Sequence, residues 1–472
     1  MTDRFDILIR GGRVVDPANR VDQVTDVGVA DGRIVAVGDD LRGHAERTLQ
    51  AAGHYVLPGL VDLHVHIALP SAPGAGHAML ARAGVTTALD LSGPAAGVLA
   101  GAAEGGGAGL SIATLELIKP GVQLPPHPSR AEIRRALDRI LAAGGLGVKL
   151  HVDAGWDAEA TGTIIDEANR AGVWVACHCG TTTAGSDIEG LRETLELAGD
   201  NRLQIAHVNS YCRGDVAGVA EEAATAIALL RGSPQVFAES YLAEINGTSS
   251  RCVDGVPANR RVIRWLEGGG YPGTEEGLRR AIRDGWASVP HVSGDDVVLR
   301  TGEEGVAAWE AAGTRSGVCL PINPGVSRLL LGASRNAAGG FDVHAFATDG
   351  GCIPRNVTLS MGLSMVEWGL LRVDDLVRKA CWTPARVLGL TAKGHLGVGA
   401  DADLVVADPA ARRPRTVIAA GAVVVHDGLV LGRGTRFIST ERGGKAVEAA
   451  TGPGTVIDVR GSGLYTGDGL AA

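Results

Sequence analysis

Between residues 58 and about 390, short apolar segments alternate with longer segments that show helical periodicity. This repeat is typical of parallel β-strands joined by helices. Eight strands with intervening helices predict an α/β fold, a (β/α)₈ TIM-like barrel. The expected helices include 130–142, 158–171, 186–197 and 215–230. The expected strands are 56–63, 86–91, 111–117, 147–152, 174–179, 203–208, 235–241 and 341–349.

The two ends of the chain show a different pattern, of short alternating strands and hairpin turns. Gly11-Gly12 and Asp31-Gly32 are typical turns in residues 1–57, and a similar pattern returns in residues 391–436. We expect the two ends to pair into one small β-sandwich domain, with the barrel of residues 58–390 inserted between them. Two independent β-appendages are the alternative.

Two segments do not fit the eight-strand repeat. Residues of about 245–340, which include a ninth apolar run at 317–322, are expected to form an insertion in the barrel with extra helices and a substrate lid. The Gly-rich tail, residues 437–472, fits either a loose arm or an oligomer contact. The sequence does not decide between them.

Composition and charge exclude several classes of partner. The formal net charge of -9 gives no basic surface for nucleic acid or an anionic membrane. No apolar run approaches a membrane span, and the first residues lack the pattern of a signal peptide. Seven scattered cysteines do not resemble a disulfide framework. We therefore expect a cytoplasmic protein with reduced thiols that acts on a small molecule.

Residues that can bind a cation follow five of the expected strands. His64 and His66 stand two residues apart on the first strand, so their side chains point the same way and can bind one metal. A single histidine at a strand end is more often an ordinary polar residue, but the carboxyl ends of barrel strands meet at one face. The other strands contribute Lys149, His178, His207 and Asp349.

Neighbouring side chains allow other interpretations. Cys177 and Cys179 flank His178 and point away from it, so we interpret both as core residues. Cys352, just after Asp349, is interpreted as a loop thiol. His151 lies two residues after Lys149 on the same face, where it can contact substrate or replace one of the ligands.

Four motifs together resemble the amidohydrolase superfamily, in its binuclear, carbamylated-lysine branch. They are Asp-Ile-Leu-Ile-Arg-Gly-Gly-Arg-Val-Val-Asp at 6–16, Pro-Gly-Leu-Val-Asp-Leu-His-Val-His at 58–66, Thr-Pro-Ala-Arg-Val-Leu-Gly-Leu at 383–390 and Gly-Val-Gly-Ala-Asp-Ala-Asp-Leu-Val-Val at 397–406. The resemblance spans nearly the whole chain. It also implies a homo-oligomer.

This resemblance implies two divalent metal ions, with Zn²⁺ as the default, and a ligand set. One ion would be held by His64, His66 and Asp349, and the other by His178 and His207. Lys149, carboxylated by CO₂, would bridge both together with a hydroxide. An ammonium beside two dications would have a depressed pKa, and the carbamate removes that conflict. The alternative is a lysine stem that packs in the barrel with its amine in solvent.

The mechanism that this resemblance implies uses Asp349 as the catalytic base. It would accept the proton of the attacking hydroxide and pass it to the leaving nitrogen. Tyr211, Tyr241 and Asn323 are candidate oxyanion donors because they lie in or beside loops that follow strands. Arg213 and Arg355 can each bind a substrate carboxylate through a bidentate fork, although surface arginines without such a role are commoner.

The first functional hypothesis is a cyclic amidase similar to hydantoinase, dihydropyrimidinase and dihydroorotase. Residues 236–242 resemble the seventh-strand region of that group. The usual Asp-His after the eighth strand is here Asp349-Gly350, and the insertion has no evident counterpart, so the substrate is less certain than the metal site.

Three alternatives remain. A linear N-acyl amino acid deacylase or dipeptidase-like amidase uses the same scaffold, although no cysteine ends the second or third strand as in the D-aminoacylase type. A mononuclear deaminase would leave Lys149 unexplained, and the nearest carboxylate, Glu189, lies well inside an expected helix. A non-catalytic barrel scaffold would be expected to lose ligands, and none is missing.

Overall fold

The two ends of the chain share one nine-stranded sheet in the computed structural model, which describes residues 4–67, 74–104 and 106–470. The order of the strands is β25-β24-β23-β22-β5-β1-β2-β3, with β4 paired to β1. Antiparallel pairing of β5 with β22 joins the two ends, with Leu57 opposite Val405. The strands are β1 (Arg4–Asp16), β2 (Val21–Ala30), β3 (Arg33–Gly38), β4 (His44–Gln50), β5 (Tyr55–Pro58), β22 (Leu404–Asp408), β23 (Arg413–Ala419), β24 (Ala422–His426) and β25 (Leu429–Val430).

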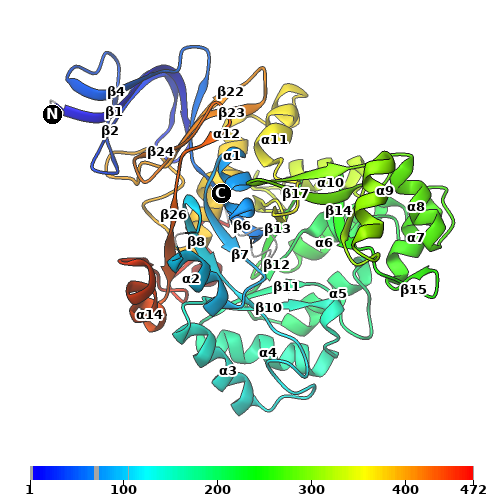
Figure 1. The fold of residues 1–472 in the computed structure, drawn as a ribbon. Helices are drawn as coiled ribbons and strands as arrows, with labels where there is room; N and C mark the ends of the chain where they lie inside the picture. Colours follow the sequence, from blue (N-terminus) through cyan, green and yellow to red (C-terminus); the bar gives the residue numbers. More distant parts are fainter. Residues whose placement is uncertain (1–3, 68–73, 105, 471–472) are drawn as a thin grey trace.

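Both faces of this sheet bury apolar side chains, because successive residues of a strand point to opposite faces. Val56 and Leu404 belong to one core cluster with Ile9, whereas Leu57 and Val405 belong to another that extends into the remainder of the chain. In Figure 1 the sheet lies at the upper left, in blue and orange, against the central strands. The sheet is therefore anchored to the part of the molecule that carries the histidines.

Parallel strands alternate with helices in the central part of the chain, so the predicted α/β class is confirmed. Neighbouring strands pair in series from β6 to β8 and from β9 to β13. The segment of β20 and β21 then pairs with β13 on one side and with β6 on the other. The strands are β6 (Leu60–His66), β7 (Val85–Asp90), β8 (Ala108–Thr114), β9 (Glu116–Leu117), β10 (Gly147–His151), β11 (Trp174–His178), β12 (Gln204–Ile205), β13 (Phe237–Ser240), β20 (Ala345–Phe346) and β21 (Gly350–Gly351).

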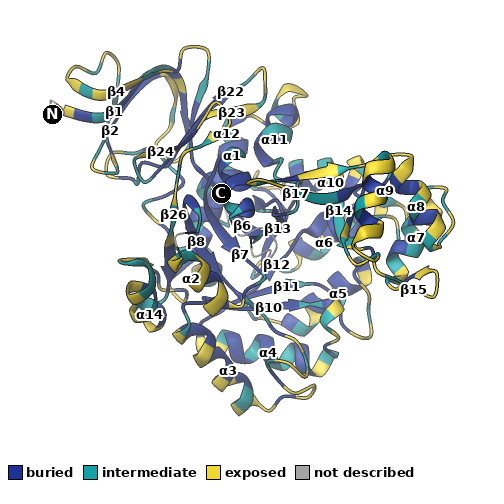
Figure 2. Cartoon of the chain, viewed as in Figure 1, coloured by how far each residue is buried: buried dark blue, intermediate teal, exposed yellow. Residues whose placement is uncertain are grey.

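The helices between these strands begin where local sequence caps them. Ser129 and Glu132 form a capping box at α3, and the side chains of Asp157 and Asp187 cap α4 and α5. Figure 2 shows that the central strands are buried while the outer faces of α3 and α4 are exposed. The helices are α1 (Ala75–Arg82), α2 (Ala95–Ala103), α3 (Arg130–Ala142), α4 (Ala158–Ala171), α5 (Ile188–Ala198) and α6 (Val219–Arg231), with α11 (Thr358–Glu367), α12 (Val373–Val377) and α13 (Thr383–Leu388) after β21.

Residues 246–333 form a separate lobe between β13 and β20, at the right of Figure 1. The apolar run at 317–322 supplies β19, which pairs antiparallel with β14 and not with the parallel series. A core cluster that includes Val262, Leu278 and Trp309 holds the lobe together. Its elements are β14 (Asn246–Ser249), β15 (Cys252–Val253), β16 (Val256–Pro257), α7 (Arg260–Gly268), α8 (Glu275–Arg283), β17 (Val289–Ser293), β18 (Asp296–Arg300), α9 (Gly302–Ala311), β19 (Gly317–Leu320) and α10 (Gly325–Ala333).

The C-terminal segment returns to the central strands. β26 (Gly434–Ser439) pairs in parallel with β8, and α14 (Glu441–Thr451) contacts α2 and α3. β27 (Thr455–Val456) and α15 (Gly463–Thr466) follow, and Phe437 and Leu464 are fully buried. A loose arm therefore does not describe the tail up to residue 470.

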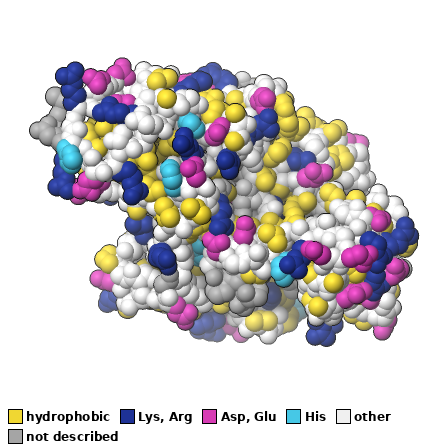
Figure 3. All heavy atoms as spheres, turned by 45° about the horizontal axis from the view of Figure 1, so that its top comes forward, with side chains coloured by type: hydrophobic (Ala, Val, Ile, Leu, Met, Phe, Trp, Pro, Cys, Tyr) yellow, Lys and Arg dark blue, Asp and Glu magenta, His cyan; other side chains and the backbone are white. Residues whose placement is uncertain are grey.

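On the face in Figure 3, basic and acidic side chains are interspersed, without a large patch of one sign. In the described part of the chain, no helix combines the length and hydrophobicity needed to cross a bilayer.

Candidate metal centre

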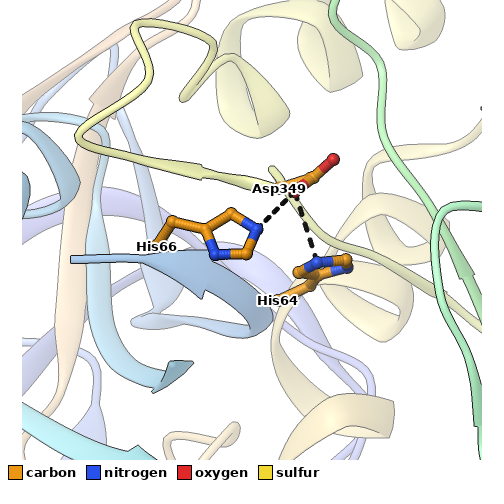
Figure 4. Close-up of side chains that lie close together, drawn as sticks. All are labelled: His64, His66 and Asp349. Carbon is orange, nitrogen blue, oxygen red and sulfur yellow. Dashed lines mark hydrogen bonds and ion pairs between the residues drawn. The ribbon is translucent and has the colours of Figure 1, made fainter. Parts of the chain in front are cut away.

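Two histidines of β6 and one aspartate of the β20–β21 segment point at a common position (Figure 4). Oδ1 of Asp349 lies 3.2 Å from Nε2 of His64 and 2.9 Å from Nε2 of His66. The three potential ligand atoms lie within 4.8 Å of one another. The backbone fixes this arrangement, because the Asp349 N–H donates to the His64 carbonyl at 2.8 Å. These residues form a compact site for one cation.

The second nitrogen of each β6 histidine is also bonded. Nδ1 of His64 lies 2.7 Å from Oε1 of Glu239 on β13, and Nδ1 of His66 lies 2.5 Å from Oγ of Ser92. Such outer contacts orient a ligating imidazole and make it more basic. The sequence analysis missed Glu239, although a charged residue within an apolar strand was a signal that could have identified it.

Lys149 brings a buried amine to the same cavity. Its side chain on β10 is 1% exposed, and Nζ has no hydrogen-bond partner in the described residues. Burial lowers the pKa of Lys149, while Glu239 and Asp349 act in the opposite direction. A buried amine without a partner is costly, so this position fits an amine that is covalently modified or bound to a further group.

His178 and His207 complete the set of predicted ligands. His178 ends β11, and its Nε2 lies 2.7 Å from Oγ of Ser186. His207 follows β12 with a φ of 35°, and its ring centroid lies 4.4 Å from that of His178 and 5.1 Å from that of His64. Burial lowers the pKa of His178, His207 and His64 well below the ordinary value, so each imidazole is neutral and can donate a lone pair.

One cavity of about 150 Å³ joins all six side chains. The cavity is lined by every predicted metal ligand: His64, His66, Lys149, His178, His207 and Asp349. His151 also lines the cavity, and its ring centroid lies 4.0 Å from that of His178. The donor set consists of imidazole, carboxylate and amine groups, which suits divalent transition metals.

Comparison with known proteins agrees with this donor set. A sequence model of the Amidohydrolase family matches residues 324–436. A dihydroorotase from Citrifermentans bemidjiense is 26% identical over 431 residues, which cover 86% of this chain and 90% of the relative. The chain is therefore similar to amidohydrolases over most of its length. These similarities support a metal-dependent hydrolase that acts on carbon–nitrogen bonds other than peptide bonds.

Solved structures show the same fold. A D-aminoacylase aligns with a TM-score of 0.62 at 19% identity, covering 92% of this chain and 99% of that one. That structure was determined to define one-metal activation and second-metal attenuation in its binuclear centre. A D-hydantoinase aligns with a TM-score of 0.57 at 20% identity, covering 92% of this chain and 98% of that one.

Of the five residues proposed as oxyanion donors or carboxylate binders, Arg355 lines the cavity. Its Nη2 lies 2.6 Å from Oδ2 of Asp349, Nε donates to the Asp349 carbonyl, and Nη1 donates to Asn246 at 2.9 Å. Although burial opposes it, Arg355 together with His64 holds the pKa of Asp349 well below its usual range. In this structure Arg355 therefore orients the aspartate.

The other predicted substrate contacts lie outside the cavity lining. The hydroxyl of Tyr211 accepts a hydrogen bond from the Cys179 N–H at 2.8 Å. Arg213 and the hydroxyl of Tyr241 both donate to Oδ1 of Asn323 at 3.0 Å. Buried polar groups must find partners, and these side chains find theirs within the protein. Contact of the four with substrate stays a prediction that this geometry does not support.

Asp62 is a second residue that the sequence analysis missed. It is buried on β6, and its carboxylate accepts from the Thr348 hydroxyl at 2.6 Å and from the His64 N–H at 3.1 Å. Burial raises the pKa of Asp62 to about 7. This contact ties β6 to the segment that carries Asp349, and so fixes the distance between the two sets of ligands.

Proposed function

We propose that this protein is a metal-dependent enzyme that hydrolyses a C–N amide bond, in a ring opening of a cyclic amide or ureide. One observation carries the proposal: His64, His66 and Asp349 converge within 4.8 Å, in a cavity that also contains the partnerless amine of Lys149. Five candidate metal ligands and an amine that can form a carbamate are more than a structural role for these buried residues requires.

The residues present fit two divalent ions. His64, His66 and Asp349 would hold one ion, His178 and His207 the second, and Lys149 would bridge the two as a carbamate. Carbamate formation joins the Lys149 nitrogen to CO₂ and releases one proton, which turns the buried amine into an anionic oxygen donor. Zn²⁺ is the first choice, although Mn²⁺, Co²⁺ and Fe²⁺ accept the same donors. When bound, such ions lower the pKa of a water and polarise the substrate carbonyl.

The chain itself supplies the proton transfer. Asp349 is kept ionised by Arg355 and is aimed into the cavity, so Oδ1 can accept a proton from the attacking water. The same carboxyl then gives that proton to the leaving nitrogen. Arg355 prevents Asp349 from rotating away, since it binds both the carboxylate and the backbone carbonyl of that residue.

The fold supports the site in the way expected of a (β/α)₈ barrel. The parallel pairings begin and end at β6, with β8 and β9 following each other without pairing in the part of the chain that the structure describes, and this order favours a closed barrel. The β-sandwich stays a proposal for the nine-stranded sheet. The predicted ligands lie in the last residues of β6, β10 and β11 or shortly after β12 and β20, towards the carboxyl ends of the strands. The homo-oligomeric state and the cytoplasmic location stay predictions.

Linear amide hydrolysis is the second candidate function. It is favoured by the lobe of residues 246–333, which covers the cavity with Asn246, Thr248, Arg261 and Trp265 and can enclose an acyl chain. The comparisons include both reaction types, a D-hydantoinase and a D-aminoacylase.

Mass spectrometry separates the two functions. Metal-loaded protein is incubated with a mixed library of cyclic ureides, lactams and N-acyl amino acids. Ring opening adds one water and leaves the compound in one piece, whereas linear hydrolysis yields an acid and an amine. The ring-opening proposal predicts the first result and is wrong if only split products form. If metal-loaded protein forms neither the ring-opened product nor the split products, both functions are contradicted.

A further inference from the structure

The cavity of the candidate metal centre is covered on one side by α7 of the 246–333 lobe. Asn259 caps this helix, accepting from the Arg261 N–H at 3.0 Å, and its Nδ2 donates to Thr248 of β14 at 3.3 Å. Arg261 and Trp265, one turn apart, both line the cavity. The start of α7 is thus held at the cavity, and its inner face presents one cation and one aromatic ring.

A cation at this place does not stabilise the helix. Arg261 lies in the first turn of α7, where the backbone N–H groups already make the helix end positive. The first turn of α7 contains no acidic residue. Helix stability would favour an acid here, so the arginine requires another explanation.

An anionic ligand can replace the partner of Arg261 in its ion pair. Its Nη2 lies 2.5 Å from Oδ1 of Asp153, whose side chain is 54% exposed, and no other residue of the described chain pairs with the guanidinium. Exposed pairs of this type contribute little to stability, about 0–1 kcal/mol. The guanidinium keeps donors that can serve a second anion.

The other basic side chains that line the cavity already have partners or lie among the candidate metal ligands. Arg355 binds Asp349 and Asn246, and Lys149 lies among the candidate metal ligands. Among the described residues that line the cavity, Arg261 is therefore the cation that remains for a substrate.

We propose that Arg261 determines specificity, binding the carboxylate of an anionic amide substrate while Trp265 contacts its apolar part. The inference rests on the proposed hydrolytic function and names its substrate class: small cyclic or N-acyl amides that carry a carboxylate. The planar guanidinium fork matches a carboxylate in two parallel hydrogen bonds, and Asp153 is displaced when the substrate enters.

Matched ligand pairs test this proposal on the metal-loaded protein. Orotate and uracil share a ring that resists hydrolysis and differ by one carboxylate, and N-acetylglycine and its amide are a linear pair. Calorimetry is expected to show that at least one carboxylate form binds about tenfold or more tightly than its neutral partner. Arg261→Met should abolish that preference, while Arg261→Lys should keep part of it.

Two further variants separate substrate binding from a structural latch. Arg260→Met removes the same charge from the exposed neighbouring position of α7 and should leave the preference intact. Asp153→Asn removes the internal competitor and should leave the carboxylate affinity equal or higher. If Arg261 only latched α7 to Asp153, both Arg261→Met and Asp153→Asn would weaken the two members of each pair equally, and the proposal would be wrong.

Turnover distinguishes a failure of this inference from a failure of the proposed function. Dihydroorotate and dihydrouracil are compared with the linear pair for hydrolysis by the same preparations. A carboxylate preference in binding without any hydrolysis would overturn the proposed function and keep the assignment of Arg261. Equal affinity for charged and neutral partners in both pairs, or no binding of either carboxylate, would overturn the assignment of Arg261.

Discussion

Oε1 of Glu239 lies 2.7 Å from Nδ1 of His64, and both side chains are fully buried. The contact joins β13 to β6 across the interior and points Nε2 of His64 at Asp349. Burial raises the pKa of Glu239 to about 8, so both protonation states of this side chain are populated near neutral pH. A bound cation would favour the carboxylate and thereby a more basic His64.

Replacing Glu239 by glutamine should weaken metal binding by about 10–100-fold, because His64 loses the carboxylate that orients its ring and makes it more basic. The dissociation constant is measured by competition with a chromophoric chelator. Glu167→Gln is the matched control, since Glu167 is also buried but pairs with Arg130 on the outer helices. Unchanged metal affinity in Glu239→Gln would show that His64 does not depend on this contact.

Lys149→Met should reduce the bound metal from two ions to one while the metal-free protein keeps its free energy of unfolding. The amine has no partner to lose, so a methionine of similar length replaces it at little cost. Metal content is measured by mass spectrometry and stability by urea denaturation.

A second buried lysine provides the contrast for this prediction. Nζ of Lys393 lies 2.6 Å from Asp403 and 3.0 Å from Asp401. Lys393→Met leaves the buried carboxylate of Asp403 without its cation and should cost about 3–5 kcal/mol. Equal destabilisation by the two variants would mean that Lys149 is paired in solution, contrary to the structure.

Arg355→Met should lower kcat by roughly 10–100-fold, since Asp349 loses a charged hydrogen bond and its fixed orientation. Arg355 helps to hold the pKa of Asp349 low, so its removal raises that pKa. The acidic limb of the kcat/KM profile should therefore move to higher pH. Arg328→Met is the control, because Arg328 binds backbone carbonyls outside the cavity. An unshifted acidic limb would argue against Asp349 as the base.

Acid should destabilise the protein in part through His344, which accepts a hydrogen bond from the Ala238 N–H at 3.1 Å. Burial, with Lys379 nearby, lowers the pKa of His344 from 6.5 to about 4. Between these values the unfolded chain binds more protons, so the free energy of unfolding falls as the pH falls through this window, by up to roughly 3 kcal/mol.

Urea denaturation of wild type and His344→Gln across that window measures this contribution. The variant should show a flatter dependence of unfolding free energy on pH. His127→Gln should not, because the His127 side chain is 80% exposed. Parallel curves for wild type and His344→Gln would contradict the assignment.

The sequence places the candidate metal ligands near one another, because strand periodicity and the family resemblance indicate the same positions. His64 and His66 share a face at spacing two, and the carboxyl ends of parallel strands converge, so Lys149, His178, His207 and Asp349 meet in one cavity. Tyr211 and Tyr241 were selected because they follow strands. Loop conformation and internal hydrogen bonds, which periodicity does not encode, determine where their hydroxyls point.

The insertion is expected from the sequence to form a substrate lid, but the residues that cover the cavity could not be predicted, for a related reason. Arg261 comes from a lobe with its own core, and its position over the cavity depends on tertiary contacts such as Asn259 with Thr248. Glu239 and Asp62 act through other residues, and such contacts have no signature in a single sequence.

The most direct test of the account is hydrolysis measured against equivalents of Zn²⁺ added to chelator-stripped protein, for wild type and Asp349→Asn. The substrates are the cyclic ureides and lactams of the library. We predict that stripped wild type is inactive, that activity returns as metal binds, and that Asp349→Asn stays folded but inactive. Hydrolysis by stripped protein, or unaltered turnover by Asp349→Asn, would contradict the proposed metal centre and its base.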